Sequence, residues 1–254
     1  MYPSDLTDSE WKFIEKKLDR KMLQRKRKYS LLLIFNGIFY QLKAGCQWRM
    51  LPKDLPPWNL VYYYFRKWSQ EGLIEYLHEA LRDQIRDQSG KSPSPSAACI
   101  DSQSVKTSRK GGIRGIDGGK RIKGRKRHIV VDTLGMLLAV VVHSAHIHDS
   151  RAGFEVLNKL RGRFPRLQII WADKGYRGSL IETVQQKLGW ILEVVQRNRP
   201  WEGFKPLAKR WVVERTFAWF ESYRRLAKDY EFLPKTSESM IQLAMIRLML
   251  KRIN

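Results

Sequence analysis

The 254-residue sequence is poor in cysteine, in acidic residues and in uninterrupted apolar stretches. Its two cysteines, Cys46 and Cys99, form no Cys-x-x-Cys pair and have no histidine at metal-ligand spacing. This pattern predicts a reducing compartment and excludes a cysteine-based structural zinc site. The longest apolar stretch, residues 31–42, is interrupted by Asn36 and Gln41. It falls short of the ~18 uninterrupted apolar residues that a membrane span requires.

The first residues also lack the basic segment followed by an apolar segment that marks a secretory signal. Together with the lack of a membrane span, this predicts a soluble, cytoplasmic protein with no membrane partner. Hydrophobic residues make up 43% of the chain and aromatic residues 11%. That is enough apolar surface to offset the entropy of ordering, so we expect a folded protein and not a disordered one.

The shortage of acidic residues leaves a large positive charge. The chain has 48 Lys and Arg against 25 Asp and Glu, a formal net charge of +23. A field of this sign attracts polyanions and releases the counterions condensed on them, so nucleic acid is the expected partner. Ribosomal proteins and membrane-surface proteins share this property. The charge therefore indicates the class of ligand but no chemistry.

The first 88 residues carry helical signals only. Thr7 and Glu10 have capping-box spacing, which predicts the start of a helix. Gly45 follows a second apolar segment and is expected to end it, and Asn59 is expected to cap a third helix. A Gly/Pro/Ser cluster at residues 89–96 has no apolar periodicity, as is typical of a linker. We therefore expect a small all-helical domain at 1–88.

The pattern changes to strands mixed with helices in a second domain, predicted at 97–254. Three strands in a row followed by alternating helices and strands is the element order of a ribonuclease H-like fold. The predicted fold class is therefore α/β, with a ribonuclease H-like mixed sheet and flanking helices behind the helical domain. The expected elements are a strand at 97–101, a hairpin at 128–143, a helix at 149–160, a strand at 167–173, a helix at 179–188, a strand at 191–195 and a long helix at 206–227.

Two aspartates each end a predicted strand. Asp101 and Asp173 stand at the carboxyl ends of strands that can lie side by side in a parallel sheet, where sites form in open α/β sheets. Glu214 lies on the last predicted helix. Mg²⁺ prefers carboxylate oxygens, water and substrate phosphate as ligands. These three carboxylates are therefore candidates for a metal-dependent phosphodiester site.

Each of these acidic residues has a simpler alternative. A carboxylate at a strand end is often a turn or cap residue. Asp132 competes as a ligand but is expected to form the turn of the hairpin, and Asp149 is expected to cap a helix. Glu221 lies on the same helical face as Glu214 and is its one serious rival, although it could pair with Arg224 or Arg225 instead.

Five segments of the chain resemble bacterial insertion-sequence transposases, in the family conventionally numbered five. The segments are residues 2–11, 45–52 with 56–58, 101–106, 172–177 and 210–215. The likeness runs from residue 2 to near the C-terminus. It implies a DDE catalytic triad on a ribonuclease H-like fold, with the first aspartate at Asp101, the second at Asp173 and the glutamate at Glu214.

The resemblance also implies an activity and its partners. We expect a metal-dependent DNA transposase, an endonuclease and polynucleotidyl transferase that cleaves transposon ends and joins the 3′-hydroxyl to target DNA. The implied cofactor is Mg²⁺, with Mn²⁺ as a substitute, and Asp101, Asp173 and Glu214 are its ligands. The implied partners are the terminal inverted repeats and target DNA, bound by a homodimer at the bacterial nucleoid. The resemblance also implies that the helical domain at 1–88 is a DNA-binding domain that reads the transposon ends. A nuclease or resolvase without strand transfer and a non-catalytic DNA-binding descendant are the alternatives.

The chain departs from the family pattern at two positions. Related transposases often show Tyr-x-x-Arg-x-x-x-Glu with a lysine seven positions after the glutamate. Here Arg210 and Glu214 match, but Leu207 and Glu221 replace the tyrosine and the lysine. The DNA-contacting lysine is therefore unassigned. Substitutes for it are expected on the same helix, at Arg224, Arg225 and Lys228.

A basic, glycine-rich segment follows Asp101. From Lys106 to Arg127 it holds ten Lys or Arg and six Gly. We expect a flexible loop that wraps DNA beside the site and is disordered without it, the alternative being a solvated charge run. The expected DNA-binding residues are Lys106, Arg109, Lys110, Lys120, Arg121, Lys123, Arg125, Lys126, Arg127, Lys174, Arg177, Arg210, Arg224, Arg225 and Lys228.

Overall fold

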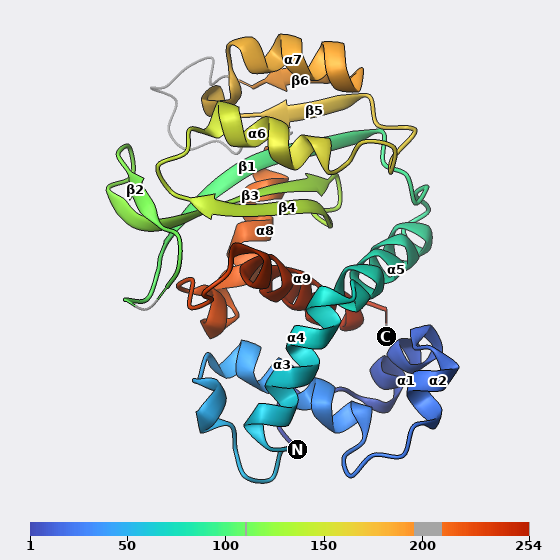
Figure 1. Ribbon diagram of the computed structural model, residues 1–254. Helices are drawn as coiled ribbons and strands as arrows, with labels where there is room; N and C mark the ends of the chain where they lie inside the picture. Colours follow the sequence, from blue (N-terminus) through green and yellow to red (C-terminus); the bar gives the residue numbers. More distant parts are fainter. Residues whose placement is uncertain (110, 196–209, 254) are drawn as a thin grey trace.

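A mixed β-sheet organises the second half of the chain in the computed structural model, which describes residues 1–109, 111–195 and 210–253 (Figure 1). Within this described part the sheet has six strands. Its order is β2-β3-β1-β5-β6, and β4 also pairs with β3. The strands are β1 (Ala97–Lys106), β2 (Gly115–Asp117), β3 (Ile122–Asp132), β4 (Leu137–Ser144), β5 (Ile169–Ala172) and β6 (Ile191–Val194).

The strand directions follow the ribonuclease H-like order. β1, β3 and β4 are antiparallel neighbours, whereas β5 and β6 join β1 in parallel. The predicted fold class is therefore confirmed. The hairpin between β3 and β4 turns where the sequence predicts it, and Asp132 forms that turn by accepting hydrogen bonds from the Leu134 and Met136 N–H groups at 2.8 and 2.9 Å.

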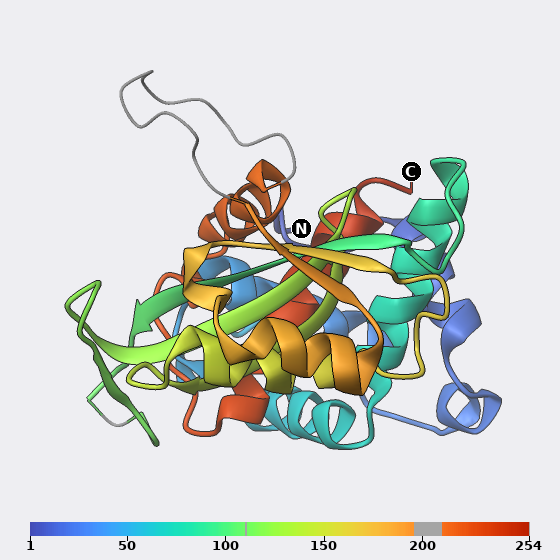
Figure 2. The ribbon, with the colours of Figure 1, turned by 90° about the horizontal axis from the view of Figure 1, so that it is seen from above.

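Helices cover both faces of this sheet. α6 (Asp149–Asn158) and α7 (Ser179–Leu188) lie on one face, and α8 (Trp211–Glu221) lies on the other (Figure 2). Successive side chains of a strand point to opposite faces, so β3 supplies Val130 to the core under α6 and α7, and Val131 to the opposite core. Double coverage also explains why every residue of β4 is buried.

Two of the expected helix signals act as predicted, at the start of α1 and at the end of α3. The third is wrong, because α4 begins at Trp58 with Pro57 at its N-cap, so Asn59 lies inside the helix and does not cap it. Thr7 and Glu10 form both bonds of the capping box at the start of α1. Gly45 ends α3 in the left-handed conformation, with φ of 69°. A Cβ there would lie 2.7 Å from the Cβ of Arg224, so glycine suits both the conformation and the packing. The helices are α1 (Asp8–Lys17), α2 (Arg20–Gln24), α3 (Leu31–Ala44), α4 (Trp58–Gln70) and α5 (Leu73–Gln88), with the short η1 (Trp48–Met50).

The last helix, α9 (Pro234–Leu250), packs against both halves of the chain. It contacts α5 on one side and β4 on another. Glu10 of α1 forms a buried ion pair with Arg247 of α9. The apolar core is continuous from Leu6 to Leu250. One core therefore includes residues from both sides of the linker predicted at 89–96. The boundary between the domains stays a prediction.

Two predicted segments differ from the observed elements. The basic segment expected to be a flexible loop instead forms the end of β1, all of β2 and the start of β3, because backbone pairing with neighbouring strands orders it. The long helix expected at 206–227 stops at Glu221, where the Ser222 hydroxyl donates to the Trp219 carbonyl at 2.8 Å. A 3₁₀ turn, η3 (Arg224–Leu226), follows. Residues 206–209 of that prediction, including Leu207, lie outside the described residues.

No helix in the described ranges is both long enough and apolar enough to span a membrane.

Candidate active site

Asp101 and Asp173 come from neighbouring parallel strands. Cys99 of β1 pairs with Trp171 of β5, and each aspartate stands two residues further along its own strand direction. The two carboxylates therefore lie at the same level of the sheet. Asp101 was expected at the end of its strand, but β1 continues to Lys106 because pairing with β3 extends it, so Asp101 lies in the middle of the strand.

The Asp173 side chain shapes the turn that follows β5. Its Oδ1 accepts a hydrogen bond from the Gly175 N–H at 2.8 Å, which caps η2 (Lys174–Tyr176). The turn leaves Lys174 exposed and buries Tyr176. Asp173 can therefore be both a cap residue and a site residue. Its Oδ1 holds the turn, and its negative charge still acts on Asp101.

The Asp101 carboxylate is largely removed from solvent. Its side chain is 15% exposed, and Oδ1 accepts a hydrogen bond from the Ser102 N–H at 2.7 Å. Its pKa is raised to about 6. Burial and the negative charge of Asp173 raise it, whereas the Ser102 hydrogen bond and the charges of Arg210 and Lys120 oppose the increase. A carboxylate in this state attracts a cation that can enter the site.

Glu214 lies on α8, the helix on the face of the sheet opposite to α6 and α7. It lies in the first turn of α8, which packs against β1, and its side chain is 50% exposed. Arg210 lies between the two carboxylates. Its Nη2 is 3.3 Å from Asp101 Oδ2 and 3.4 Å from Glu214 Oε1. The guanidinium therefore bridges the first and third members of the predicted triad.

The distances between the three carboxylates bear on whether they can bind a metal ion together. Among the described residues, no three His, Cys, Asp or Glu side chains are close enough together to hold a metal ion. Asp101 and Asp173 lie on neighbouring strands, but between Asp101 and Glu214 the positive charge is supplied by the Arg210 guanidinium. The donor set still fits a hard divalent ion, since it consists of carboxylate oxygens and already binds a positive group.

The predicted DNA-binding residues differ in their exposure to solvent. Arg210 is half-buried at the site. Lys110 lies outside the described residues. The exposed members lie at the end of β1, between β1 and β3, on β3, in and after η2, and after α8, and they are Lys106, Arg109, Lys120, Arg121, Lys123, Lys174, Arg177, Arg224 and Lys228.

Four predicted DNA contacts are wrong, because their side chains are buried in polar networks. Arg125 forms an ion pair with Asp229 at 3.2 Å, and Arg127 donates to the Leu226 carbonyl at 2.8 Å. Burial also lowers the pKa of Arg127 to about 10. The other two residues are Lys126, which pairs with Asp149, and Arg225, which pairs with Glu231.

The Arg225 pairing also removes one expected partner of Glu221, which is exposed at the end of α8.

The expected role of Asp149 as a helix cap is wrong as well. The N-cap of α6 is His148, whose side chain accepts a hydrogen bond from the Ser150 N–H. Asp149 instead accepts a hydrogen bond from Lys126 at 2.8 Å and faces His128. Sequence reasoning missed this network because its members come from β3 and α6, and no local spacing relates them.

The fold and the paired carboxylates thus define a ribonuclease H-like α/β protein with an acidic site on its central strands. A family model described as "Transposase DDE domain" matches residues 92–249, more than half of the chain. A second model, described as "Putative transposase of IS4/5 family", matches residues 6–78. The chain belongs to the DDE transposases of insertion sequences, which confirms the resemblance stated from its motifs.

One curated relative is the protein of Burkholderia cepacia named "Putative transposase for insertion sequence element IS402". It is 32% identical over 115 residues, which cover 42% of this chain and 54% of the relative. The match therefore spans about half the length of that protein.

Proposed function

We propose that this protein is a DNA transposase that cleaves the ends of its insertion sequence and joins the freed 3′-hydroxyl to target DNA. The observation that carries the proposal is the placement of Asp101 and Asp173 at the same level of adjacent parallel strands. Glu214 lies on α8 across that site, linked to it by Arg210. Family membership supports the same reaction class.

In this proposal Asp101, Asp173 and Glu214 hold Mg²⁺, for which Mn²⁺ can substitute. Bound ions of this kind activate the attacking hydroxyl and stabilise the leaving oxygen in phosphoryl transfer. Arg210 would leave its carboxylate contacts and bind the backbone phosphate at the cleaved bond, since a guanidinium binds phosphate as well as carboxylate. Water first attacks the phosphodiester at the end of the element, and the resulting 3′-hydroxyl then attacks a target phosphodiester.

The proposed partners are transposon-end DNA and target DNA. The net charge of +23 and the exposed basic residues around the site support binding to a polyanion. Because two ends are joined in one event, a homodimer on DNA is part of the proposal. A bacterial cytoplasmic location at the nucleoid follows from the same partners.

A strand-transfer assay tests the proposal. The full chain is incubated with Mg²⁺, a donor that carries the ends of its element, and a supercoiled target plasmid. Joined product supports the transposase, whereas cleavage without joining indicates a nuclease or resolvase, and neither product indicates a DNA-binding descendant. Asp101→Asn, Asp173→Asn and Glu214→Gln should each abolish joining, whereas Asp87→Asn on the exposed face of α5 should not. Joining retained by all three site variants would contradict the assignment.

A further inference from the structure

We propose that Asp149 is a positioning residue of the site, with one carboxylate oxygen anchored by Lys126 and lying beside His128, and the other facing the turn that carries Asp173. This inference rests on the proposed function. Asp149 lies at the start of α6, outside the predicted triad. The triad residues are on β1, at the end of β5 and on α8, so Asp149 adds a fourth element to the site.

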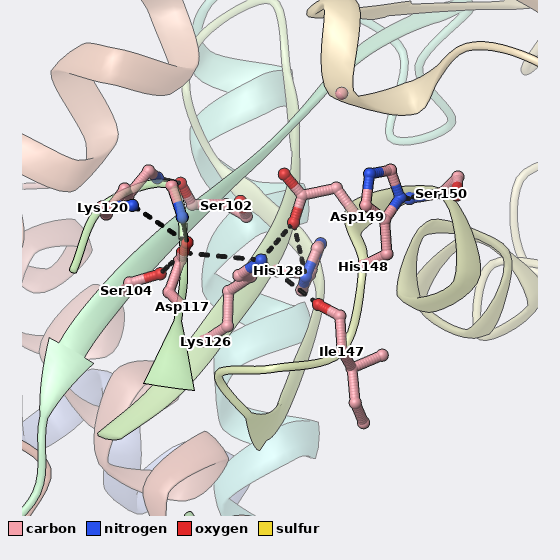
Figure 3. A network of polar contacts seen from close by, with 12 residues as sticks. Ser102, Ser104, Asp117, Lys120, Lys126, His128, Ile147, His148, Asp149 and Ser150 are labelled. Atoms are coloured by element: carbon pink, nitrogen blue, oxygen red, sulfur yellow. Dashed lines mark hydrogen bonds and ion pairs between the residues drawn. The ribbon is translucent and has the colours of Figure 1, made fainter. Parts of the chain in front are cut away.

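The anchored oxygen is Oδ1 (Figure 3). Lys126 Nζ donates to it at 2.8 Å, and the His128 Nε2 lies 3.6 Å from it. Lys126 is buried and also lies 3.6 Å from Asp117 Oδ2. His128 is fully buried. The Lys126 hydrogen bond restrains the Asp149 carboxylate, because Lys126 is buried on β3, a central strand of the sheet.

The other oxygen, Oδ2, faces the Asp173 turn. A Cβ built on Gly175 would lie 3.0 Å from Asp149 Oδ2 and also 3.0 Å from Asp173 Oδ1. The two carboxylate oxygens are therefore no more than about 6 Å apart, on either side of Gly175. Any side chain at position 175 would push against both carboxylates. Glycine lets the turn approach Asp149 closely.

Tyr176 provides a second connection between this network and the turn. Its hydroxyl lies 2.8 Å from His128 Nδ1, and its backbone N–H donates to the Asp173 carbonyl at 3.2 Å. Burial lowers the pKa of His128 and raises that of Tyr176, so a neutral imidazole and a neutral phenol share this hydrogen bond. The negative charges of Asp101, Asp149 and Asp173 all contribute to the raised pKa of Tyr176.

The network thus ties Asp173 to Asp101. His128 is the cross-strand partner of Ser102, the residue after Asp101. Strand pairing thus places Asp101 near His128, which bonds to Tyr176 in the Asp173 turn. On the other side, Lys126 bonds to Asp149, which faces the same turn. Hydrogen-bonded groups that orient metal ligands commonly alter metal affinity by about 10–100-fold when they are removed.

Mn²⁺ binding to the full chain tests this role. The dissociation constant is measured by electron paramagnetic resonance for the wild type, Asp149→Asn and the matched control Asp117→Asn. Asp117 shares Lys126 with Asp149, but its other partners are Ser104 and the Gly119 and Lys120 N–H groups. We expect Asp149→Asn to weaken binding by about 10–100-fold. Asp117→Asn should change it much less. Equal binding by wild type and Asp149→Asn, or an equal loss in both variants, would overturn the inference.

Two further measurements separate this role from simple loss of stability. Plasmid cleavage by Asp149→Asn should recover at high Mn²⁺ concentration, because the defect lies in affinity, whereas persistent loss at saturation contradicts the inference. If Asp149→Asn does not fold, Tyr176→Phe decides, since it keeps the buried ring and removes the hydroxyl that bonds to His128 and Ser102. It should weaken Mn²⁺ binding, and unchanged binding overturns the inference.

The reference variant is Asp101→Asn. If the wild type binds Mn²⁺ no better than Asp101→Asn, the proposed function itself fails. If Asp101→Asn loses binding while Asp149→Asn and Tyr176→Phe keep it, only the role of Asp149 fails.

Discussion

The guanidinium of Arg210 donates a hydrogen bond to the Asp101 carboxylate at 3.3 Å, linking the start of α8 to the middle of β1. The same nitrogen reaches Glu214 at 3.4 Å. In the protein alone, one cationic side chain thus balances part of the charge of the site carboxylates. It also places the helix that carries Glu214 beside the strand that carries Asp101.

Removing this cation should make Asp101 a weaker acid. In Arg210→Ala we expect the pKa of Asp101 to rise above about 6, because burial and the charge of Asp173 remain while an opposing positive charge is lost. Titration of the Asp101 carboxyl carbon by ¹³C NMR, without metal, measures it. Arg210→Lys keeps the charge and should stay nearer the wild type. A pKa that stays the same or falls in Arg210→Ala would contradict the ion pair.

The raised pKa of Asp101 makes folding stability depend on pH. The folded chain binds this proton more tightly than the unfolded chain, whose pKa is near 3.8. The resulting stability is fully present below pH 3.8 and is lost as the pH rises through about 6. The loss is about 3 kcal/mol, from 1.36 kcal/mol per pKa unit. Urea unfolding in EDTA at pH 4 and pH 7 measures this loss. Between these pH values the unfolding free energy of the wild type should fall more than that of Asp101→Asn, and an equal change in both proteins would refute the prediction.

The same proton competes with a cation. Mn²⁺ affinity should therefore increase as the pH rises through about 6, where Asp101 loses its proton. Isothermal titration calorimetry between pH 5 and pH 8 measures the dependence. An affinity that is constant over this range would show that Asp101 does not titrate as the metal binds.

The buried pair of Arg125 and Asp229 should be structural. Asp229 also accepts hydrogen bonds from the Ser237 hydroxyl at 2.7 and 2.8 Å, and Arg125 donates to the Glu231 and Phe232 carbonyls. Asp229→Ala leaves the Arg125 charge buried without its carboxylate, so we expect a loss of about 3–5 kcal/mol in unfolding free energy.

Urea denaturation measures this loss. The control is the pair of half-buried Lys67 and exposed Glu71, 3.8 Å apart at the end of α4, where Glu71→Ala should cost less than about 1 kcal/mol. Similar losses of unfolding free energy in the two variants would show that the buried pair stabilises the fold no more than the pair on the surface.

Exposed basic residues just before and at the start of β3 should bind DNA phosphate. The double variant Arg121→Ala with Lys123→Ala should lower affinity for duplex DNA and reduce the slope of log affinity against log salt by about 1.8, at ~0.9 for each phosphate contact. Fluorescence anisotropy at several salt concentrations measures both. Lys187→Ala, at an exposed position of α7, is the control and should keep the wild-type slope. Equal slopes in the two variants would place the DNA elsewhere.

Much of the fold could be predicted because its signals are local. The capping box at Thr7 and Glu10, the glycine at position 45 and the turn at Asp132 each act within a few residues. The apolar segments at the strands are likewise local, and chain order then placed Asp101 and Asp173 on strands that can be parallel neighbours. These predictions needed no knowledge of distant contacts.

The errors concern residues whose surroundings come from elsewhere in the chain. Arg125 and Arg127 look like DNA contacts in a basic segment, but β3 lies inside the sheet and carbonyls of the 226–232 segment bind both guanidinium groups. The basic segment itself becomes ordered through pairing of β2 and β3. Strand pairing and burial depend on partners that local sequence does not specify.

The sequence by itself therefore determined the family and much of the order of elements, although not α2, β2 or α9, and it supplied the three acidic residues of the predicted site. Tertiary structure decided which cations are exposed, that Arg210 bridges Asp101 and Glu214, and that Asp149 faces the Asp173 turn. The physical reason is range. Helix caps and turns form between near neighbours, whereas the charge balance of a buried site depends on side chains that only the folded sheet brings together.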